Sequence, residues 1–112
     1  MTTGSDTTER MRVEVLYFDG CPNHEAFLPR LRELVAMTGG DADVELRRVD
    51  DLGAAERERF LGSPTVRVNG VDIDAGARTR SDFGLKCRLY RTDTGLHGQP
   101  PDEMVLAALR RS

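Results

Sequence analysis

The stretch Tyr17–Pro29, with the sequence YFDGCPNHEAFLP, joins a predicted strand to a predicted helix. The strand is the apolar and β-branched run VEVLYF at Val13–Phe18, which is typical of a central strand covered on both faces. The helix is indicated by apolar residues at helical spacing, and we expect it to end at Thr38–Gly40. These apolar residues are Phe27, Leu28, Leu31, Leu34 and Val35. Cys21 therefore lies at a strand-to-helix turn.

The rest of the chain continues the alternation of strands and helices. In chain order we predict an edge strand at Val44–Asp50, a short helix at Leu52–Gly62, a strand at Thr65–Val68, a hairpin turn at Asn69–Gly70, a return strand at Val71–Asp74, a loop at Ala75–Lys86, a short strand at Cys87–Arg91 and a helix within Pro100–Ser112. This order predicts an α/β fold, with a mixed sheet of four or five strands and helices on both faces.

The composition is that of a globular protein. The 112 residues are 38% hydrophobic and carry a formal net charge of −3, with the two signs interspersed. We expect a disordered tail at residues 1–10 and a single domain at residues 11–112. No apolar run predicts a membrane span, the polar N-terminus does not resemble a secretory signal, and no basic stripe predicts nucleic-acid binding. We therefore expect a cytoplasmic protein whose two cysteines are free thiols.

Cys21 is the first candidate for chemistry. If Pro22 is the first or second helical residue, the Cys21 sulfur faces unpaired backbone amides and the positive end of the helix dipole, which lower the pKa of a thiol. His24 lies one turn along the helix, where as a cation it would stabilise the thiolate and as a neutral base it could move a proton. Asp19 would oppose the thiolate if it were close. The alternative is a buried, inert cysteine.

Pro64 is the second candidate. It lies in the sequence GSPTV at Gly62–Val66, directly before a predicted strand. Bonds that precede proline are those that readily become cis, and proline itself lacks an N–H group. Such a turn would present the backbone groups of Ser63 and its neighbours to a docking molecule.

Together these features resemble the thioredoxin superfamily. The matching residues are the motif CPNH at a strand-to-helix turn, Pro29 eight positions after Cys21, and the motif SPT with Pro64 43 positions after Cys21. The resemblance covers about Val13–Gly70 and the C-terminal helix. It implies a thioredoxin-like three-layer sandwich, a reactive thiolate at Cys21 and a cis bond before Pro64.

The resemblance also implies where a substrate would dock. In this family the nucleophilic cysteine and the cis-proline lie side by side, so Pro22, Ser63, Pro64 and Thr65 would line the docking surface. One position departs from the family motif, because His24 stands where thioredoxins have their second cysteine. Release of a bound substrate would then need a second thiol from elsewhere in the chain or from glutathione.

Cys87 is the remaining cysteine, in the sequence GLKCRLY. In a short strand it could be a buried small hydrophobic residue. The hairpin at Asn69–Gly70 would bring the chain back toward Cys21, so Cys87 could instead resolve a mixed disulfide formed at Cys21. The sequence leaves open whether the two cysteines meet.

A pair of thiolates at Cys21 and Cys87 would also suit a soft metal ion such as Hg(II). The motifs YFDGCPN and CRLYR resemble small proteins labelled as thioredoxin-like or as alkylmercury lyases. Lyase chemistry would need both cysteines and an aspartate that protonates the carbon–mercury bond, and the candidates are Asp19, Asp74 and Asp82.

The sequence thus predicts thiol–disulfide exchange through Cys21, with His24 and Cys87 as the other catalytic candidates and no cofactor. The reaction partners would be protein or small-molecule thiols and disulfides, and the oligomeric state is open. Two alternatives remain: a mercury-binding or lyase-like protein that uses Cys21 and Cys87, and a non-catalytic module that binds a protein partner around Pro64.

Overall fold

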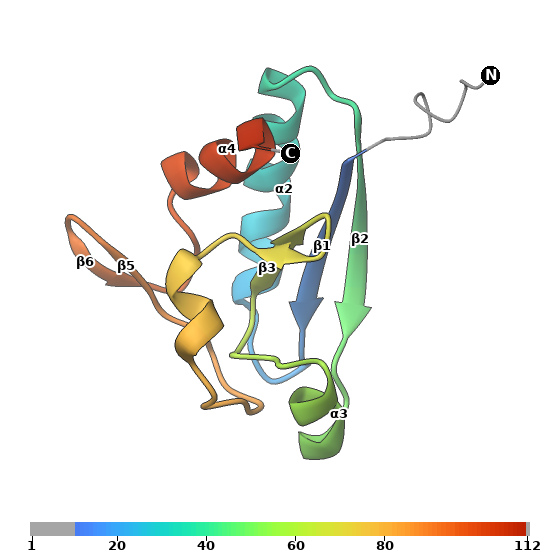
Figure 1. Cartoon of the computed structure of the whole chain (residues 1–112), viewed down its shortest axis with the longest axis vertical. Helices are drawn as coiled ribbons and strands as arrows, with labels where there is room; N and C mark the ends of the chain where they lie inside the picture. Colours follow the sequence, from blue (N-terminus) through green and yellow to red (C-terminus); the bar gives the residue numbers. More distant parts are fainter. Residues whose placement is uncertain (1–10, 112) are drawn as a thin grey trace.

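Strand β1 (Met11–Tyr17) lies inside a four-stranded mixed sheet with the order β2-β1-β3-β4 (Figure 1). The computed structural model describes residues 11–111, so the tail predicted at residues 1–10 lies outside the described residues. The other elements are α2 (Asn23–Met37), β2 (Ala42–Arg48), α3 (Leu52–Arg57), β3 (Thr65–Val68), β4 (Val71–Asp72), the 3-10 helix η1 (Ala75–Thr79), β5 (Tyr90–Thr92), β6 (Gly95–His97) and α4 (Asp102–Arg111). The chain is therefore an α/β domain, as the sequence predicts.

The sheet is mixed because its two kinds of connection differ. Helix α2 links β1 to the parallel strand β2, whereas β3 runs antiparallel to β1 and returns through a tight turn into β4. Asn69 and Gly70 form that turn with φ values of 51° and 85°, which asparagine and glycine tolerate better than other residues. β2 is an edge strand, as predicted.

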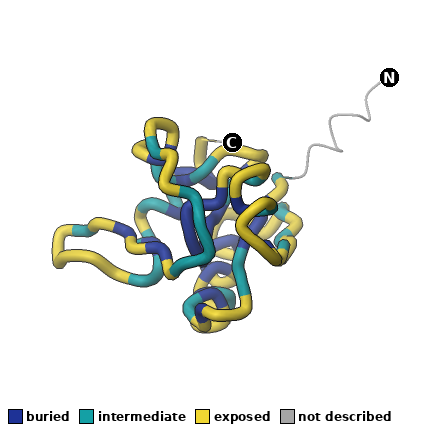
Figure 2. Tube along the Cα trace, turned by 90° about the horizontal axis from the view of Figure 1, so that it is seen from below, coloured by how far each residue is buried: buried dark blue, intermediate teal, exposed yellow. Residues whose placement is uncertain are grey.

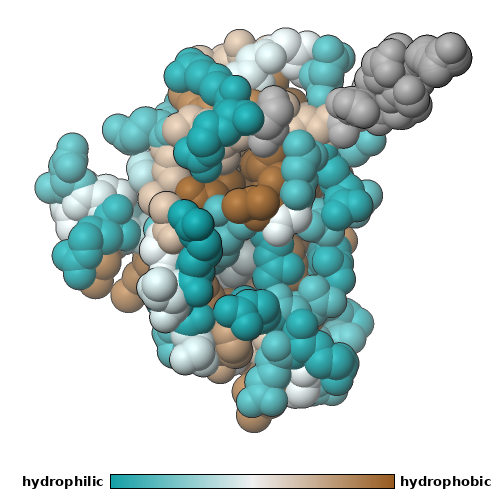
Figure 3. Space-filling model, viewed as in Figure 1, coloured by the Kyte–Doolittle hydropathy of each residue, from teal (hydrophilic) through white to brown (hydrophobic). Residues whose placement is uncertain are grey.

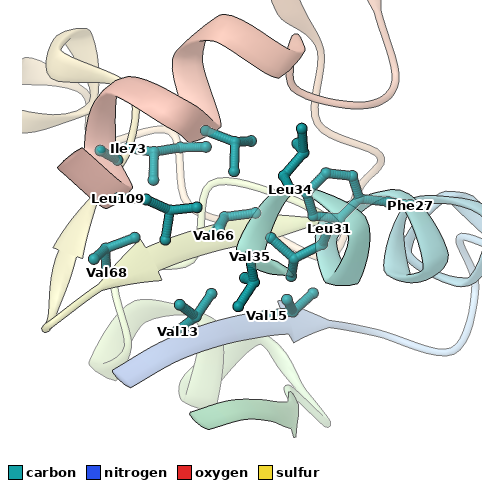
Figure 4. Close-up of a cluster of buried hydrophobic side chains, with 12 residues drawn as sticks. Val13, Val15, Phe27, Leu31, Leu34, Val35, Val66, Val68, Ile73 and Leu109 are labelled. Carbon is teal, nitrogen blue, oxygen red and sulfur yellow. The ribbon is translucent and has the colours of Figure 1, made fainter. Parts of the chain in front are cut away.

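The main core lies between one face of the sheet and the helices α2 and α4. Figure 4 shows side chains of both helices pointing toward Val13, Val15 and Val66 of the strands. Alternate residues of β1 point to this face, which accounts for the apolar spacing of the strand. Helix α2 contributes Phe27, Leu31, Leu34 and Val35 to this core. Each fully buried side chain of this size contributes about 1.5–3 kcal/mol of hydrophobic stabilisation.

The opposite face of the sheet is covered only in part. Leu16 packs there with Val49, Ala55 and Phe60, and Ala55 belongs to the short helix α3. Glu14 points to the same face and is only 5% exposed, and its carboxylate accepts a hydrogen bond from Arg47. The helical layer expected on both faces is therefore extensive on one face and limited to α3 on the other.

Several predicted boundaries are wrong. α3 ends at Arg57 rather than at Gly62. Arg59, two residues later, has a φ of 55°, which is incompatible with a right-handed helix. The predicted loop at Ala75–Lys86 begins with the 3-10 helix η1. The last strand begins at Tyr90 rather than Cys87, and it pairs with β6 in a hairpin that sequence patterns did not indicate.

That hairpin, β5–β6, projects from the rest of the molecule and is largely exposed (Figures 1 and 2). Figure 3 shows mainly hydrophilic side chains on one face of the molecule, with hydrophobic side chains gathered near its middle. Among residues 11–111, no helix combines the length and the apolar character needed to cross a bilayer.

Candidate functional site

Cys21 lies in the turn between β1 and α2, at the end of the sheet that is lowest in Figure 1. Pro22 is the N-cap residue of α2 and contributes no side-chain hydrogen bond to the helix, so the first amides of α2 have no cap from it. The predicted placement of the cysteine beside a helix N-terminus is therefore confirmed. Cys21 is 0% exposed, however, which places it out of reach of solvent.

The structure joins Cys21 to Cys87 by a disulfide, with the two Cα atoms 5.7 Å apart. The expectation of two free thiols is therefore wrong for this structure, and the two cysteines do meet. Cys87 is exposed, in contrast to Cys21. The exposed residue of the disulfide is thus Cys87, which follows η1, and the buried residue is Cys21, which precedes α2.

His24 lies in the first turn of α2 and is largely buried. Its Nδ1 atom is 3.0 Å from the carbonyl oxygen of Cys21, and its ring stacks on Tyr17 with 4.2 Å between the centroids. Because a carbonyl oxygen only accepts hydrogen bonds, this contact places a hydrogen on Nδ1. His24 therefore holds the backbone of the turn that carries Cys21, a positioning contact rather than one with the sulfur.

The peptide bond between Ser63 and Pro64 is cis, as the resemblance implies. Ser63, Pro64 and Thr65 are all buried, so in this structure they are not exposed to a docking molecule. The Ser63 amide donates to the carbonyl of Lys86 at 2.8 Å, and the Ser63 carbonyl accepts from the amide of Arg88 at 2.9 Å. The backbone groups expected to receive a substrate are already paired with the chain itself.

Residues Lys86–Tyr90, here called the Cys87 strap, make these contacts. The strap runs parallel to Ser63 in a single β-bridge at Cys87. Cys87 lies between Lys86 and Arg88, whose backbone groups pair with Ser63, and this pairing places Cys87 beside the turn that precedes β3. The Cys21 sulfur in turn lies 3.6 Å from the carbonyl oxygen of Ser63.

Arg88 anchors the strap, and it is a residue that sequence reasoning missed. Its side chain is 0% exposed, and its two terminal nitrogens donate to the carboxylate of Asp72 at 2.8 and 3.1 Å. One of these nitrogens also donates to the hydroxyl of Thr65 at 3.2 Å. The run CRLYR does not distinguish Arg88, which is buried, from Arg91, which is exposed, so the sequence alone did not identify this anchor.

Tyr90 is the second anchor of the strap. Its hydroxyl donates to the carbonyl of Pro64 at 2.6 Å, and its ring lies 4.6 Å from the guanidinium carbon of Arg88. Tyr90 is 0% exposed, and this burial raises the pKa of its hydroxyl above the ordinary range of tyrosine. The two anchors bind the strap to β4 and to the turn at Pro64.

Gly62 allows the strap to approach so closely. A Cβ atom at this position would lie 2.9 Å from the Lys86 carbonyl oxygen and 2.9 Å from the Cβ of Arg88. The φ of 126° at Gly62 is a conformation that other residues rarely adopt. Glycine is therefore required here both for the backbone conformation and for the space it leaves.

The three candidate aspartates all lie beside cations. Asp19 is 3.4 Å from Arg48, and Asp74 is 3.7 Å from Arg88. Asp82 accepts hydrogen bonds from Arg80 and from Lys86, and these hold its pKa well below the ordinary value. Within residues 11–111 there is no group of three or more histidine, cysteine, aspartate or glutamate side chains that could hold a metal ion.

Comparisons of the chain with protein-family models, with curated proteins and with solved structures found no match. The chemistry of the site therefore has to be inferred from the disulfide, its surroundings and the strap.

Proposed function

We propose that this protein carries out thiol–disulfide exchange through the Cys21–Cys87 pair, as a thioredoxin-like thiol–disulfide oxidoreductase. The observation that supports this proposal is the disulfide itself, which joins a buried cysteine at a helix N-terminus to an exposed one beside a cis-proline turn. An exchanging disulfide needs one sulfur that an incoming thiolate can reach. It also needs a second sulfur that can leave as a thiolate, and a helix N-terminus stabilises that anion.

The exchange conserves electrons between the protein and its partner. Two partner thiols give up two electrons and form one disulfide, while the Cys21–Cys87 bond accepts those electrons and becomes two thiols. The reverse reaction oxidises the two cysteines and reduces a partner disulfide. Cys87 supplies the second thiol within the chain, which the motif CPNH itself lacks.

The proposal includes a thioredoxin-like arrangement of the sheet and a cytoplasmic location. The parallel pair β1–β2 joined by α2, followed by the antiparallel strand β3 after a cis-proline, supports the first. Disulfides in the cytoplasm are usually transient and catalytic, so a cytoplasmic location and a redox-active pair are consistent with each other. The partners would be protein or small-molecule thiols and disulfides.

A redox titration tests this function. The protein is equilibrated in glutathione buffers of graded ratio, and the Cys21–Cys87 bond is followed by mass spectrometry, with Cys21→Ser as the control that cannot form it. We expect a midpoint within the range of cellular exchange proteins, about −270 to −120 mV. A midpoint below about −300 mV would identify a structural disulfide and overturn the proposal.

The same two cysteines support a second candidate, the binding of Hg(II). Once reduced, their sulfurs would be close enough for one ion, because the two Cα atoms are only 5.7 Å apart. Two thiolates are a suitable ligand set for a thiophilic cation. The reduced protein should then bind one equivalent of Hg(II) tightly, and both Cys21→Ser and Cys87→Ser should lose this affinity.

Carbon–mercury bond cleavage is less well supported than binding. It would need a carboxylic acid that donates a proton, and cations lie beside each of the candidates Asp19, Asp74 and Asp82. For Asp82, the hydrogen bonds from Arg80 and Lys86 hold the pKa of the carboxyl group well below its ordinary value, so this carboxylate has no proton to give. Release of the hydrocarbon from a simple organomercurial, measured by gas chromatography, tests this activity.

A non-catalytic module that binds partners around Pro64 is the weakest alternative. Ser63, Pro64 and Thr65 are buried, and the Ser63 backbone is paired with the Cys87 strap. A binding module of this kind would keep its full biological activity after Cys21→Ser, whereas an exchange protein would lose it.

A further inference from the structure

We infer that Cys87, rather than Cys21, is the sulfur that reacts with the partner, and that Cys21 acts only inside the protein. This inference rests on the proposed exchange function and assigns the roles of the two cysteines. The sequence motif CPNH predicts the opposite order, with Cys21 as the attacking thiolate. Three features of the structure reverse it: the exposure of the two cysteines, the pairing of the Ser63 backbone and the surroundings of the Cys21 sulfur.

The first feature is access. A thiolate attacks a disulfide sulfur from the side opposite the leaving sulfur, so it must approach along the line of the S–S bond. Cys21 is 0% exposed, and an attack on it would have to come through the protein interior. Cys87 is an exposed residue, so a partner thiolate can approach it from solvent. A partner thiolate can therefore reach Cys87 but not Cys21.

The second feature is the occupied turn at Pro64. A partner that reached Cys21 would have to pass the Cys87 strap, whose backbone pairs with both the amide and the carbonyl of Ser63. The strap is also held by the buried side chains of Arg88 and Tyr90. These anchors do not depend on the disulfide, so they keep the strap over Cys21 after reduction.

The third feature is the setting of the Cys21 sulfur, which suits a leaving group. The N-terminus of α2 stabilises the thiolate that forms when the disulfide opens, and a more stable thiolate leaves faster. The Ser63 carbonyl oxygen, 3.6 Å from the sulfur, can then accept the S–H hydrogen once Cys21 is protonated. The buried cysteine thus has the N-terminus of α2 beside it in its ionised form and a hydrogen-bond acceptor in its protonated form.

The reaction then proceeds in two steps. A partner thiolate attacks the Cys87 sulfur, a bond forms between the two, and Cys21 leaves with the electron pair of the broken S–S bond and takes up a proton. A second partner thiolate attacks the partner sulfur of this mixed disulfide, which releases the oxidised partner and frees Cys87 as a thiolate. In the reverse direction Cys87 attacks a partner disulfide, and Cys21 resolves the mixed disulfide by attacking Cys87.

Single-cysteine variants test the assignment. Cys21→Ala leaves Cys87 as the only thiol, and Cys87→Ala leaves Cys21. Each reduced variant is mixed with dithiobis(nitrobenzoate), and the rate of release of the coloured thiolate is measured in the folded protein and again in denaturant. In the folded state we expect Cys87 to react at least about tenfold faster than Cys21, because buried cysteines are inert. Equal rates, or a faster Cys21, would overturn the assignment.

The wild-type protein provides a second measurement that requires no substitution. The oxidised protein is mixed with limiting glutathione, the reaction is stopped with acid, free thiols are blocked with N-ethylmaleimide in denaturant so that buried thiols also react, and the intact protein is fragmented in a mass spectrometer. Glutathione should be found on Cys87 and maleimide on Cys21, and the opposite pattern would refute the assignment. If the redox titration instead shows a structural disulfide, the exchange function fails, while the two single-cysteine rates still rank the sulfurs.

Discussion

Arg88 donates from its two terminal nitrogens to the two carboxylate oxygens of Asp72, at 2.8 and 3.1 Å, and its side chain is fully buried. This ion pair lies one residue after Cys87 and joins the Cys87 strap to β4. It is therefore a direct polar link between the segment that carries the exposed cysteine and the sheet. A buried charge without its partner is costly, so the pair makes the position of the strap sensitive to either residue.

Replacement of Arg88 should destabilise the fold. Arg88→Met keeps much of the side-chain volume but leaves the Asp72 carboxylate without its main partner, and we expect the free energy of unfolding to fall by about 3–5 kcal/mol. Urea denaturation of the oxidised proteins measures this change. Arg91→Met is the matched control, because Arg91 is exposed, and it should change the stability by no more than about 0.5 kcal/mol. Equal effects of the two substitutions would contradict a buried anchor at Arg88.

A methyl group at Gly62 should displace the Cys87 strap. Gly62→Ala would place a Cβ 2.9 Å from the Lys86 carbonyl oxygen, in addition to straining a backbone with a φ of 126°. We expect the loss from this overpacking alone to be about 1–3 kcal/mol. The Cys21–Cys87 bond should also form at a less negative potential, because the two cysteines are held together less firmly.

Gly95→Ala is the matched control for this substitution. Gly95 has a φ of 115°, and no atom lies within 4 Å of the position that its new methyl group would take, so it reproduces the backbone strain without the contact. Urea denaturation and the glutathione titration of both variants separate the two effects. If Gly62→Ala changes the free energy of unfolding and the potential of the Cys21–Cys87 bond no more than Gly95→Ala does, the close approach of the strap to Gly62 does not contribute to either.

Tyr90 should make the protein less stable in alkali. Burial raises the pKa of its hydroxyl in the folded state, whereas the hydroxyl in the unfolded chain ionises near pH 10. The stabilisation by Tyr90 is therefore complete below about pH 10 and is lost as the pH rises toward the folded pKa. Tyr90→Phe lacks this loss, so the difference in stability between variant and wild type should stay constant below about pH 10 and shrink as the pH rises above it.

The absorbance of tyrosinate gives a direct check. The chain has two tyrosines, so Tyr17→Phe leaves Tyr90 as the only one. In that variant, the absorbance at the tyrosinate wavelength should rise only as the protein unfolds, with circular dichroism as the measure of folding. A rise near pH 10 in protein that is still folded would show that Tyr90 is not buried as described.

The first part of the fold could be predicted from the sequence because its signals are local. The apolar run of β1, the helical spacing of α2 and the turn at Asn69–Gly70 each depend on neighbours along the chain. The position of Cys21 at the start of α2 follows from the same local patterns. The later strands were predicted less well, because β4 has two residues and β6 has three, too few to show a periodic pattern.

The candidate site could be predicted only in part. Cys21, His24 and Pro64 were identified by their spacing, but their burial and their contacts depend on residues from distant parts of the chain. Arg88 gives no local signal of its pairing with Asp72, because the two residues become neighbours only when the strap packs beside β4.

By itself, the sequence determined the order of the main elements, the helix N-terminus beside Cys21 and a proline that could precede β3 in the cis form. Only the tertiary structure decided that Cys21 meets Cys87, that the Ser63 backbone pairs with the strap, and that Cys21 is buried while Cys87 is exposed. The physical reason is that backbone preferences act between near neighbours in the chain. Burial and pairing arise when segments 66 residues apart in the sequence pack against each other.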